Sequence, residues 1–190
     1  TAITEAGTMR DSDGRLIFAF PWVETVIDGV NTMTSPASWY ASVLSQIGPD
    51  KDPASVENSR FLAGLTGKLQ ISLTRTDYVS LMAGGISAFE NDADIGMKIK
   101  SGVTTQIAST SKLTVLRRRM ADFLTDSVAY FLKNYQNLPN TKSNRSLVKG
   151  AIIAFDNGLT RDGILPADDE VTGGLARLVD TESLNTNTTI

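Results

Sequence analysis

The clearest pattern of hydrophobic and polar positions lies between residues 113 and 135. Apolar residues recur there at steps of three and four, which places side chains on one face of a helix; they are Leu113, Leu116, Met120, Phe123, Leu124, Phe131, Leu132 and Tyr135. The opposite side carries the charged residues Arg117, Arg118, Asp122, Asp126 and Lys133. The pattern predicts one long amphipathic helix, about 30 Å from end to end. In a chain of 190 residues, we expect the other elements to pack on it.

Three shorter helices are predicted from their start signals and apolar faces. Ser35-Pro36 supplies a capping hydroxyl and a proline at the first helical position, so a helix is expected over 37–47. Thr74 is expected to cap a helix over 75–83, with Asp77 at its positive end. The third helix is expected over 143–157, and Asn157-Gly158 and Asp162-Gly163 are expected to end it. The apolar faces are Trp39, Tyr40, Val43, Leu44 and Ile47 in the first helix, and Val148, Ala151, Ile152, Phe155 and Leu159 in the third.

Short apolar runs between the helices predict strands. Residues 15–20 form a near-continuous apolar run, which indicates a strand that is central in its sheet and covered on both faces. Further strands are expected over 69–73, 86–90 and 95–100, with an extended segment over 102–105 and a loop over 54–68. Because strands and helices interleave, we predict a mixed α/β (α+β) fold, in which several helices pack on a central mixed sheet of short strands.

The composition excludes several classes of function. A net charge of −3 and a pI near 5.0 give no electrostatic footprint for nucleic acid, and the longest apolar run is too short to insert into a membrane. The sequence has no cysteine, which excludes disulfides and thiolate sites, and no histidine, which removes the commonest general base. The chain begins at Thr1 without a methionine, and we interpret it as a piece of a longer protein.

Two loops carry partial ligand-binding patterns. Asp11 and Asp13 fit the start of a calcium loop, but the further oxygen ligands and the final glutamate of an EF-hand are missing, so a turn is preferred. Residues 64–68, with the sequence GLTGK, are similar to part of a phosphate loop. However, Leu62 and Leu69 stand where that pattern requires a glycine and a Ser or Thr. We therefore expect neither a metal nor a cofactor.

The three consecutive arginines at 117–119 are a candidate nucleic-acid patch. On a helix they point in different directions, Asp122 can pair with Arg118 or Arg119, and no interleaved aromatic residues offer base stacking. A solvated or interface-forming face is the preferred interpretation. Gly84-Gly85 lacks a third glycine at dinucleotide-binding spacing and is expected to end a helix. Because the carboxylates are scattered, we predict no catalytic residue and no enzyme activity.

From Ser35 onward, the serial order of short motifs resembles one protein family. The motifs are, in order, Ser35-Pro36-Ala37-Ser38-Trp39, Pro49-Asp50-Lys51-Asp52-Pro53, Asn58 to Gly67, Leu73-Thr74-Arg75-Thr76-Asp77, Ala83-Gly84-Gly85-Ile86, Gly102-Val103-Thr104-Thr105, Arg118-Arg119-Met120-Ala121-Asp122 and Asp162-Gly163-Ile164-Leu165. This order resembles the C-terminal, core-forming half of the contractile tail sheath proteins of bacteriophages and related contractile injection systems. The resemblance covers about 35–165. It implies a sheath core-like α/β domain over 35–180. Because residues 1–10 are polar and lack periodicity, we expect an N-terminal strand or arm region over 1–34, and the polar, low-complexity residues 181–190 are expected to form a flexible C-terminal tail.

The resemblance implies a mechanical function. Sheath subunits form hexameric rings stacked helically around a tail tube, donate strands from extended arms to a neighbour's sheet, and contract to drive the tube through the target cell envelope. The expected partners are further copies of the subunit, the tail tube protein, and baseplate and tail terminator proteins. The expected location is a virion tail assembled in the cytoplasm of the bacterial host.

The resemblance also points to a contact surface for the tube. In the family, the helix after the long one helps to grip the tube, which makes Lys142, Arg145 and Lys149 candidate tube-facing residues; an ordinary solvated helix face is the alternative. Two other functions stay open. A baseplate or tail terminator component predicts a single closed ring, and a ligand-binding or enzymatic domain requires a deep pocket with convergent polar groups.

Overall fold

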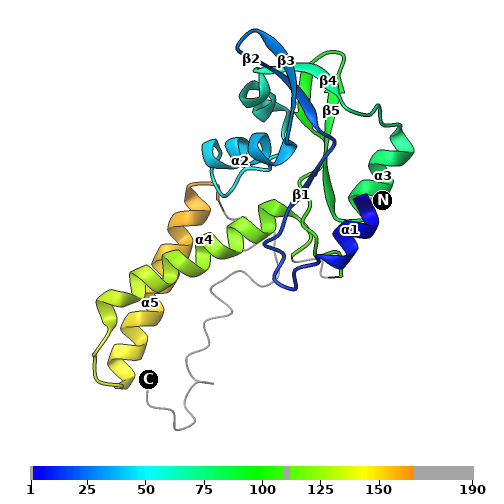
Figure 1. Ribbon diagram of the computed structural model, residues 1–190. Coiled ribbons are helices and arrows are strands. Elements are labelled where there is room, and N and C mark those ends of the chain that lie inside the picture. The colour runs from blue at the N-terminus through cyan, green and yellow to red at the C-terminus, as the bar shows by residue number, and fades with distance from the viewer. Residues whose placement is uncertain (1, 109–111, 165–190) are drawn as a thin grey trace. The chain divides into compact units, whose positions relative to one another are not determined.

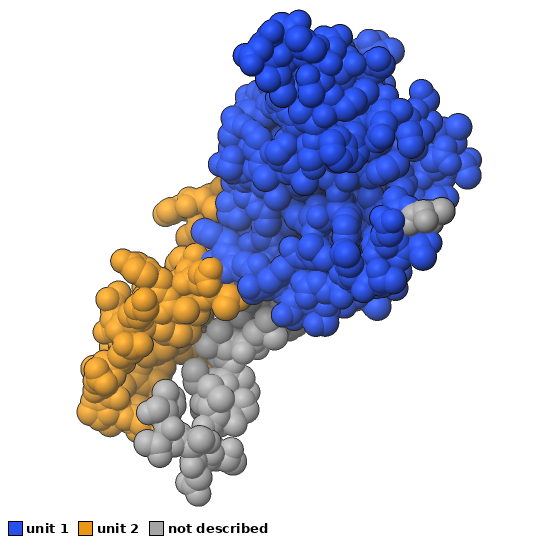
Figure 2. Space-filling model, in the orientation of Figure 1, with its two compact units in different colours: residues 1–123 blue, residues 124–190 orange. Residues whose placement is uncertain are grey.

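A computed structural model describes residues 2–108 and 112–164, and the chain divides into two compact units (Figure 1; Figure 2). Unit 1 is Thr1–Phe123 and unit 2 is Leu124–Ile190. The helix α4 (Val115–Leu132) begins in unit 1 and ends in unit 2. The predicted tail over 181–190 lies outside the described residues.

Unit 1 holds most of the secondary structure. Its elements are α1 (Ala2–Thr8), β1 (Phe18–Phe20), β2 (Val23–Ile27), β3 (Val30–Thr34), α2 (Pro36–Gln46), the 3-10 helix η1 (Val56–Leu62), β4 (Leu65–Leu69), α3 (Arg75–Ala83), β5 (Ile86–Asp92) and β6 (Gly96–Ile99). The strands form two three-stranded sheets, in the orders β1-β5-β6 and β3-β2-β4. The first sheet is mixed, because β1 runs parallel to β5 and β6 runs antiparallel to it. The mixed α/β class is confirmed, but two small sheets replace the single central sheet that we expected.

The strand β5 lies at the centre of unit 1 and has helices on both faces. Ile86 and Ala88 point to one face, where they pack in a buried cluster with Leu81 of α3. Phe89 points to the other face and meets the ring of Tyr40 of α2 edge-on, with 6.4 Å between ring centroids. Figure 1 shows α2 on one side of this sheet and α1 and α3 on the other. Alternate residues of one strand therefore fill two cores.

The apolar run at 15–20 is a strand only at 18–20, and its predicted central position is wrong. It is β1, at the edge of its sheet. Phe18 and Phe20 pack on one core and Ile17 and Ala19 on the other, so the predicted cover on both faces is confirmed. An apolar run indicates how a strand is covered, but it does not indicate whether a second strand lies on each side.

The first described residues form a helix that the sequence had not indicated. Residues 2–8 form the helix α1, and Ala6 is only 1% exposed where it packs against Leu81 and Ile86. Ala2 packs on the same cluster. A helix of seven residues is too short to show a recurring apolar stripe, so the periodicity of the sequence did not reveal it. The hairpin of β2 and β3 was also not predicted, although Asp28-Gly29 supplies the two positive φ angles that a tight hairpin turn requires.

The segment predicted as a loop over 54–68 contains η1 and most of β4. The strand expected over 69–73 instead runs from Leu65 to Leu69. Gly67 has a φ of +87° within this strand, and the pairing of β2 with β4 shifts register between Val23 and Thr25. The side chains of β4 alternate between half-buried and exposed, but the strand is short and has a glycine at its centre, which weakens its signal in the sequence. The phosphate-loop interpretation of 64–68 is excluded because these residues mostly lie in a strand and no helix follows them directly.

The capping and turn predictions are confirmed. The Ser35 hydroxyl accepts a hydrogen bond from the Ala37 amide at 3.3 Å. Thr74 and Asp77 form a reciprocal capping box at the start of α3. The amides of Asp13 and Arg15 donate to the Asp11 carboxylate at 3.0 and 2.7 Å, and these bonds hold the pKa of Asp11 below its usual value. The strands expected over 86–90 and 95–100 are β5 and β6.

The described part of unit 2 consists of two helices and a 3-10 turn. The second half of α4 is followed by η2 (Lys133–Tyr135) and by α5 (Lys142–Arg161). The long helix predicted over 113–135 is confirmed. The helix predicted over 143–157 is also confirmed, but it continues through Asn157-Gly158 and ends at Asp162, before Gly163 with a φ of +73°. Within the two cores of unit 1, α4 contributes only Val115, so the expectation that the other elements pack on this helix is wrong.

Candidate functional site

The three predicted tube-facing residues lie together on α5. Lys142, Arg145 and Lys149 recur at steps of three and four and therefore share one helix face. Lys142 is exposed and the other two are half-buried. Arg145 donates a hydrogen bond to the Asn140 side-chain oxygen at 2.9 Å, and none of the three forms an ion pair with another described residue.

The first of these charges, Lys142, lies in the first turn of α5, where a positive charge is unfavourable. The hydroxyl of Thr141 caps α5 by accepting from the Asn144 amide at 3.2 Å, and the first turn holds Lys142 but no acidic residue. Positive charge near a helix N-terminus opposes the macrodipole, typically by about 0.3–1 kcal/mol per charge. Lys142 therefore does not stabilise α5 from this position.

An open sheet edge is a second candidate surface. In the sheet β3-β2-β4, the strand β3 is at the edge and, among the described residues, pairs only with β2. The turn at Asp28-Gly29 joins the paired residues Ile27 and Val30, and the pair that closes a two-residue turn is hydrogen bonded. Hydrogen-bonded and non-hydrogen-bonded pairs alternate along an antiparallel ladder. The backbone N–H and C=O groups of Asn31 and Met33 therefore point away from β2, where another strand could bind them.

The tip of the same hairpin is apolar. Val26 is 52% exposed, Ile27 46% and Val30 63%. Exposed β-branched residues beside an unpaired edge are typical of a surface on which another chain docks. Nothing in the apolar and polar pattern of 23–34 had indicated this surface, because the hairpin itself was not predicted.

The arginines at 118 and 119 make intramolecular contacts. Arg118 and Arg15 both donate to the carboxylate of Asp122, Arg118 through Nε at 3.1 Å and Arg15 at 3.0 Å. The guanidinium of Arg119 donates to three carbonyl oxygens at the C-terminal end of α2, those of Leu44, Ile47 and Gly48, at 2.9–3.1 Å. Arg119 thus satisfies backbone groups that have no partner within α2. Burial lowers the pKa of Arg119 below its ordinary value.

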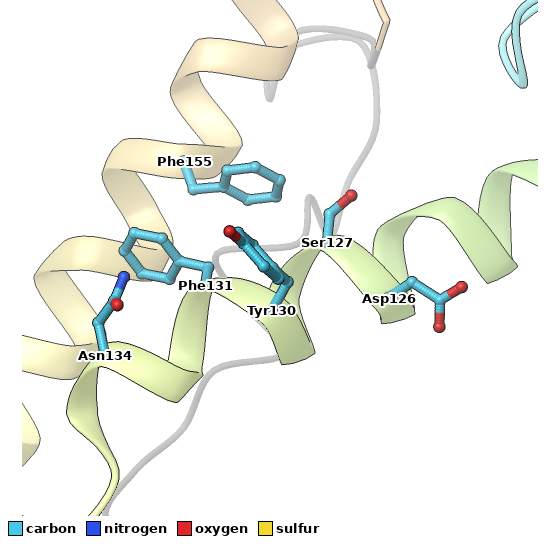
Figure 3. A pocket seen from close by; sticks show the side chains of 6 residues that line it. All are labelled: Asp126, Ser127, Tyr130, Phe131, Asn134 and Phe155. Carbon is cyan, nitrogen blue, oxygen red and sulfur yellow. The ribbon is translucent and has the colours of Figure 1, made fainter.

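Two shallow hollows occur in the described residues, one in each unit. The hollow in unit 1, about 250 Å³, lies beside Arg15, Arg118 and Asp122. The hollow in unit 2, about 440 Å³, is lined by residues of α4, η2 and α5 (Figure 3). Within 2–108 and 112–164, no three histidine, cysteine or carboxylate side chains gather to hold a metal ion. In the same residues, no helix combines the length and the apolar character that a membrane span requires.

The fold resembles that of solved proteins from contractile assemblies. A chain in the 6-fold symmetrised anti-feeding prophage baseplate gives a TM-score of 0.70 at 18% identity, over 93% of this chain and 49% of that one. A chain in the contracted PVC sheath complex of an extracellular contractile injection system gives a TM-score of 0.66 at 19% identity, over 85% of this chain and 45% of that one. A sheath tail protein from Desulfitobacterium hafniense gives a TM-score of 0.62 at 13% identity, over 85% of this chain and 42% of that one.

The chain has the fold of a contractile sheath protein. The resemblance inferred from motif order is confirmed at the level of fold, and it reaches beyond residues 35–165, since the similarity covers up to 93% of the chain. The chain spans less than half the length of each of the three similar chains. Neither protein-family models nor curated protein sequences give a match.

Proposed function

We propose that the chain is the core-forming part of a structural subunit of a contractile tail sheath. In this proposal the subunit polymerises around a tail tube and contracts to drive the tube through the envelope of a target cell. It works as part of a virion tail or related injection particle assembled in the bacterial cytoplasm. The observation that carries the proposal is the likeness to sheath proteins over 85% or more of the chain in the D. hafniense and PVC comparisons.

The proposed work is mechanical and needs no enzyme activity, cofactor or metal. Free energy would be stored as two subunit packings of different stability. Copies would be joined as hexameric rings stacked helically, with arms outside the described residues adding strands to a neighbour's sheet. Two features support this mode of assembly. The edge of β3 has backbone groups that no strand of its own sheet binds on the outer side, and the hairpin tip exposes apolar side chains to solvent.

Electron microscopy of purified protein tests the proposal directly. This chain and, where the coding sequence continues, the longer product are compared by negative stain in a series of salt concentrations. Hollow striated cylinders are the expected result for the polymerising product. If every product stays monomeric under all conditions, the lattice proposal is wrong.

A baseplate or tail terminator role is the second candidate. One of the similar structures is a 6-fold symmetrised baseplate, which keeps this alternative open. A baseplate or terminator ring closes on itself, whereas a sheath continues as an open helix. Single rings without cylinders in the same micrographs would favour the second candidate.

We propose further that Lys142, Arg145 and Lys149 face the tail tube. The support is their common helix face, their lack of ion pairs with other described residues and the unfavourable position of Lys142 in the first turn of α5. Such contacts would be polar and weak singly, and they would weaken as salt rises, because exposed charges are screened beyond about 8 Å at physiological ionic strength. A surface that must slide during contraction suits weak contacts.

The tube contact is tested by reversing the three charges to glutamate. We expect the triple variant to lose co-sedimentation with tube protein while it still self-assembles. The matched control reverses Arg10, Lys51 and Arg75, which are exposed in unit 1 and give the same change in net charge. If tube–sheath co-assembly is unchanged in the α5 variant, these residues belong to an ordinary solvated face.

A further inference from the structure

The hollow of unit 2 is an aromatic groove between two helices. Its lining consists of Asp126, Ser127, Tyr130, Phe131 and Asn134, which follow one another along α4 and η2, and Phe155 of α5 (Figure 3). The rings of Phe131 and Phe155 stack with 6.1 Å between centroids. Tyr130 stands at the groove but is 74% exposed. Its ring and those of its neighbours therefore offer a large apolar area to a docking surface.

The side of α4 and η2 that lines this groove is called the groove face, and the described part of unit 2 cannot cover it by itself. Only Ile152, Asp156 and Leu159 are buried among its described residues. The apolar stripe of α4 is half-buried where it passes through the unit, at Leu124, Phe131, Leu132 and Tyr135. Two helices side by side bury one strip of each helix, and burial of further apolar area requires a third element.

The charges on the groove face form a pattern that is complementary to itself. Asp126 and Tyr130 of α4 are four residues apart, and Lys133, the first residue of η2, follows Tyr130 by three, so all three lie on the same side of this helical segment. The Lys133 ammonium lies 5.7 Å from the centroid of the Tyr130 ring, which confirms that these two are neighbours. Neither Asp126 nor Lys133 forms an ion pair with another described residue. One unpaired acid and one unpaired base thus flank an exposed aromatic ring.

A second copy of α4 in antiparallel orientation matches this pattern. When a two-fold axis passes between positions 129 and 130, residue 126 of one copy faces residue 133 of the other. Each charged residue is then about 5 Å along the helix from the axis, at 1.5 Å per residue. The arrangement makes the pair of Asp126 and Lys133 twice, once on each side of the two Tyr130 rings. A self-complementary patch of this kind is the requirement for an isologous contact.

We propose that the groove face of α4 binds a second copy of this chain, with the two α4 helices antiparallel around a two-fold axis next to Tyr130. Tyr130 supplies the apolar centre of the contact, and the two charge pairs fix its register at the rim. The contact does not depend on the sheath proposal. In a polar helical polymer all copies point the same way, so the two-fold contact belongs to copies that are free of such a polymer.

Charge exchange across the proposed axis tests the register. Sedimentation equilibrium is measured for the chain and for Asp126→Lys, Lys133→Asp and the double variant. Each single variant places like charges opposite each other twice, and we expect the dimer dissociation constant to rise about tenfold or more. The double variant restores opposite charges in exchanged positions, so its dissociation constant is expected to return to within about threefold of the starting value. Tyr130→Ala is expected to abolish the dimer.

Two control variants separate this contact from a general effect of net charge. Asp94→Lys in the turn between β5 and β6 and Lys51→Asp in the loop after α2 make the same charge changes outside the groove, and both are expected to leave the dissociation constant unchanged. Circular dichroism confirms that each variant is folded. A chain that stays monomeric up to about 100 µM overturns the proposal. A double variant as weak as the single variants also overturns it, because another register or another surface would then make the dimer.

Discussion

Gly85 is the residue at which the turn from α3 into β5 depends most on the absence of a side chain. Its φ is +80°, and a Cβ atom there would lie 2.8 Å from the carbonyl oxygen of Thr104. Both the strained φ and the contact with backbone oppose any other residue. We expect Gly85→Ala to lower the free energy of unfolding by about 3 kcal/mol, measured by urea denaturation.

The same substitution is expected to have the opposite sign at Gly150. This glycine is inside α5, where a Cβ atom would meet nothing within 4 Å. Alanine has a higher helix propensity than glycine, so Gly150→Ala should raise the free energy of unfolding by about 0.5–1 kcal/mol. Equal losses in the two variants would show that the environment of Gly85 is not the cause.

Asp77 gives the start of α3 a dependence on pH. The hydroxyl and amide of Thr74 donate to its carboxylate at 2.7 and 2.8 Å, and these bonds lower its pKa from 3.8. When the pKa of a carboxyl is lower in the folded state than in the unfolded state, its ionised form stabilises the fold. This contribution is complete at a pH above the unfolded-state pKa and is lost as the pH falls through the folded-state pKa. We therefore expect Asp77→Asn to be less stable than the unmodified chain near about pH 6, and the difference to shrink below pH 3.8. A constant difference at all pH values in urea titrations would argue against the charge.

At the scale of elements, the sequence predicted what local chemistry determines. Ser35 and Thr74 mark helix starts because capping is made within four residues, and the stripe over 113–135 marks a helix because its period is local. The hairpin of β2 and β3 and the edge position of β1 depend on pairing between distant segments. Their apolar residues are compatible with several sheets, so periodicity alone did not place them.

The free edge of β3 is predicted to tolerate proline at one position and not at the next. The amide of Asn31 points away from β2, whereas that of Thr32 points toward it, as the register across the Asp28-Gly29 turn implies. Asn31→Pro should have a free energy of unfolding within about 1 kcal/mol of that of the unmodified chain. If a neighbour's strand binds at this edge, the variant should need about a tenfold higher protein concentration to polymerise. Thr32→Pro should lower stability by about 1–3 kcal/mol. Normal polymerisation of folded Asn31→Pro protein would exclude this edge as the site of strand addition.

At the scale of the molecule, the candidate surfaces belong to different units and differ in what the sequence revealed. The basic residues of α5 were proposed because the resembled family grips its tube with this helix, and their charge and helical spacing are visible in the sequence. The groove at Tyr130 was not found, because Phe131 and Phe155 come from helices whose contact is tertiary. The apolar stripe of α4 was correctly recognised, but a stripe does not state whether its cover comes from the same chain or from another copy.

That distinction leads to a prediction about local stability. Unit 1 has two buried clusters around β5, whereas the described part of unit 2 buries only Ile152, Asp156 and Leu159. Isolated helical segments of this length gain most of their stability from packing, so at low protein concentration the amides of α5 should exchange hydrogen much faster than those of β5.

If a second copy covers the groove, protection of α4 beyond residue 124 and of α5 should rise with protein concentration, while that of β5 should stay constant. Hydrogen exchange followed by mass spectrometry at several concentrations measures both. In Tyr130→Ala the concentration dependence should vanish and the difference between the units should remain. Uniform protection of α5 and β5 at every concentration would mean that unit 2 is stabilised within its own chain.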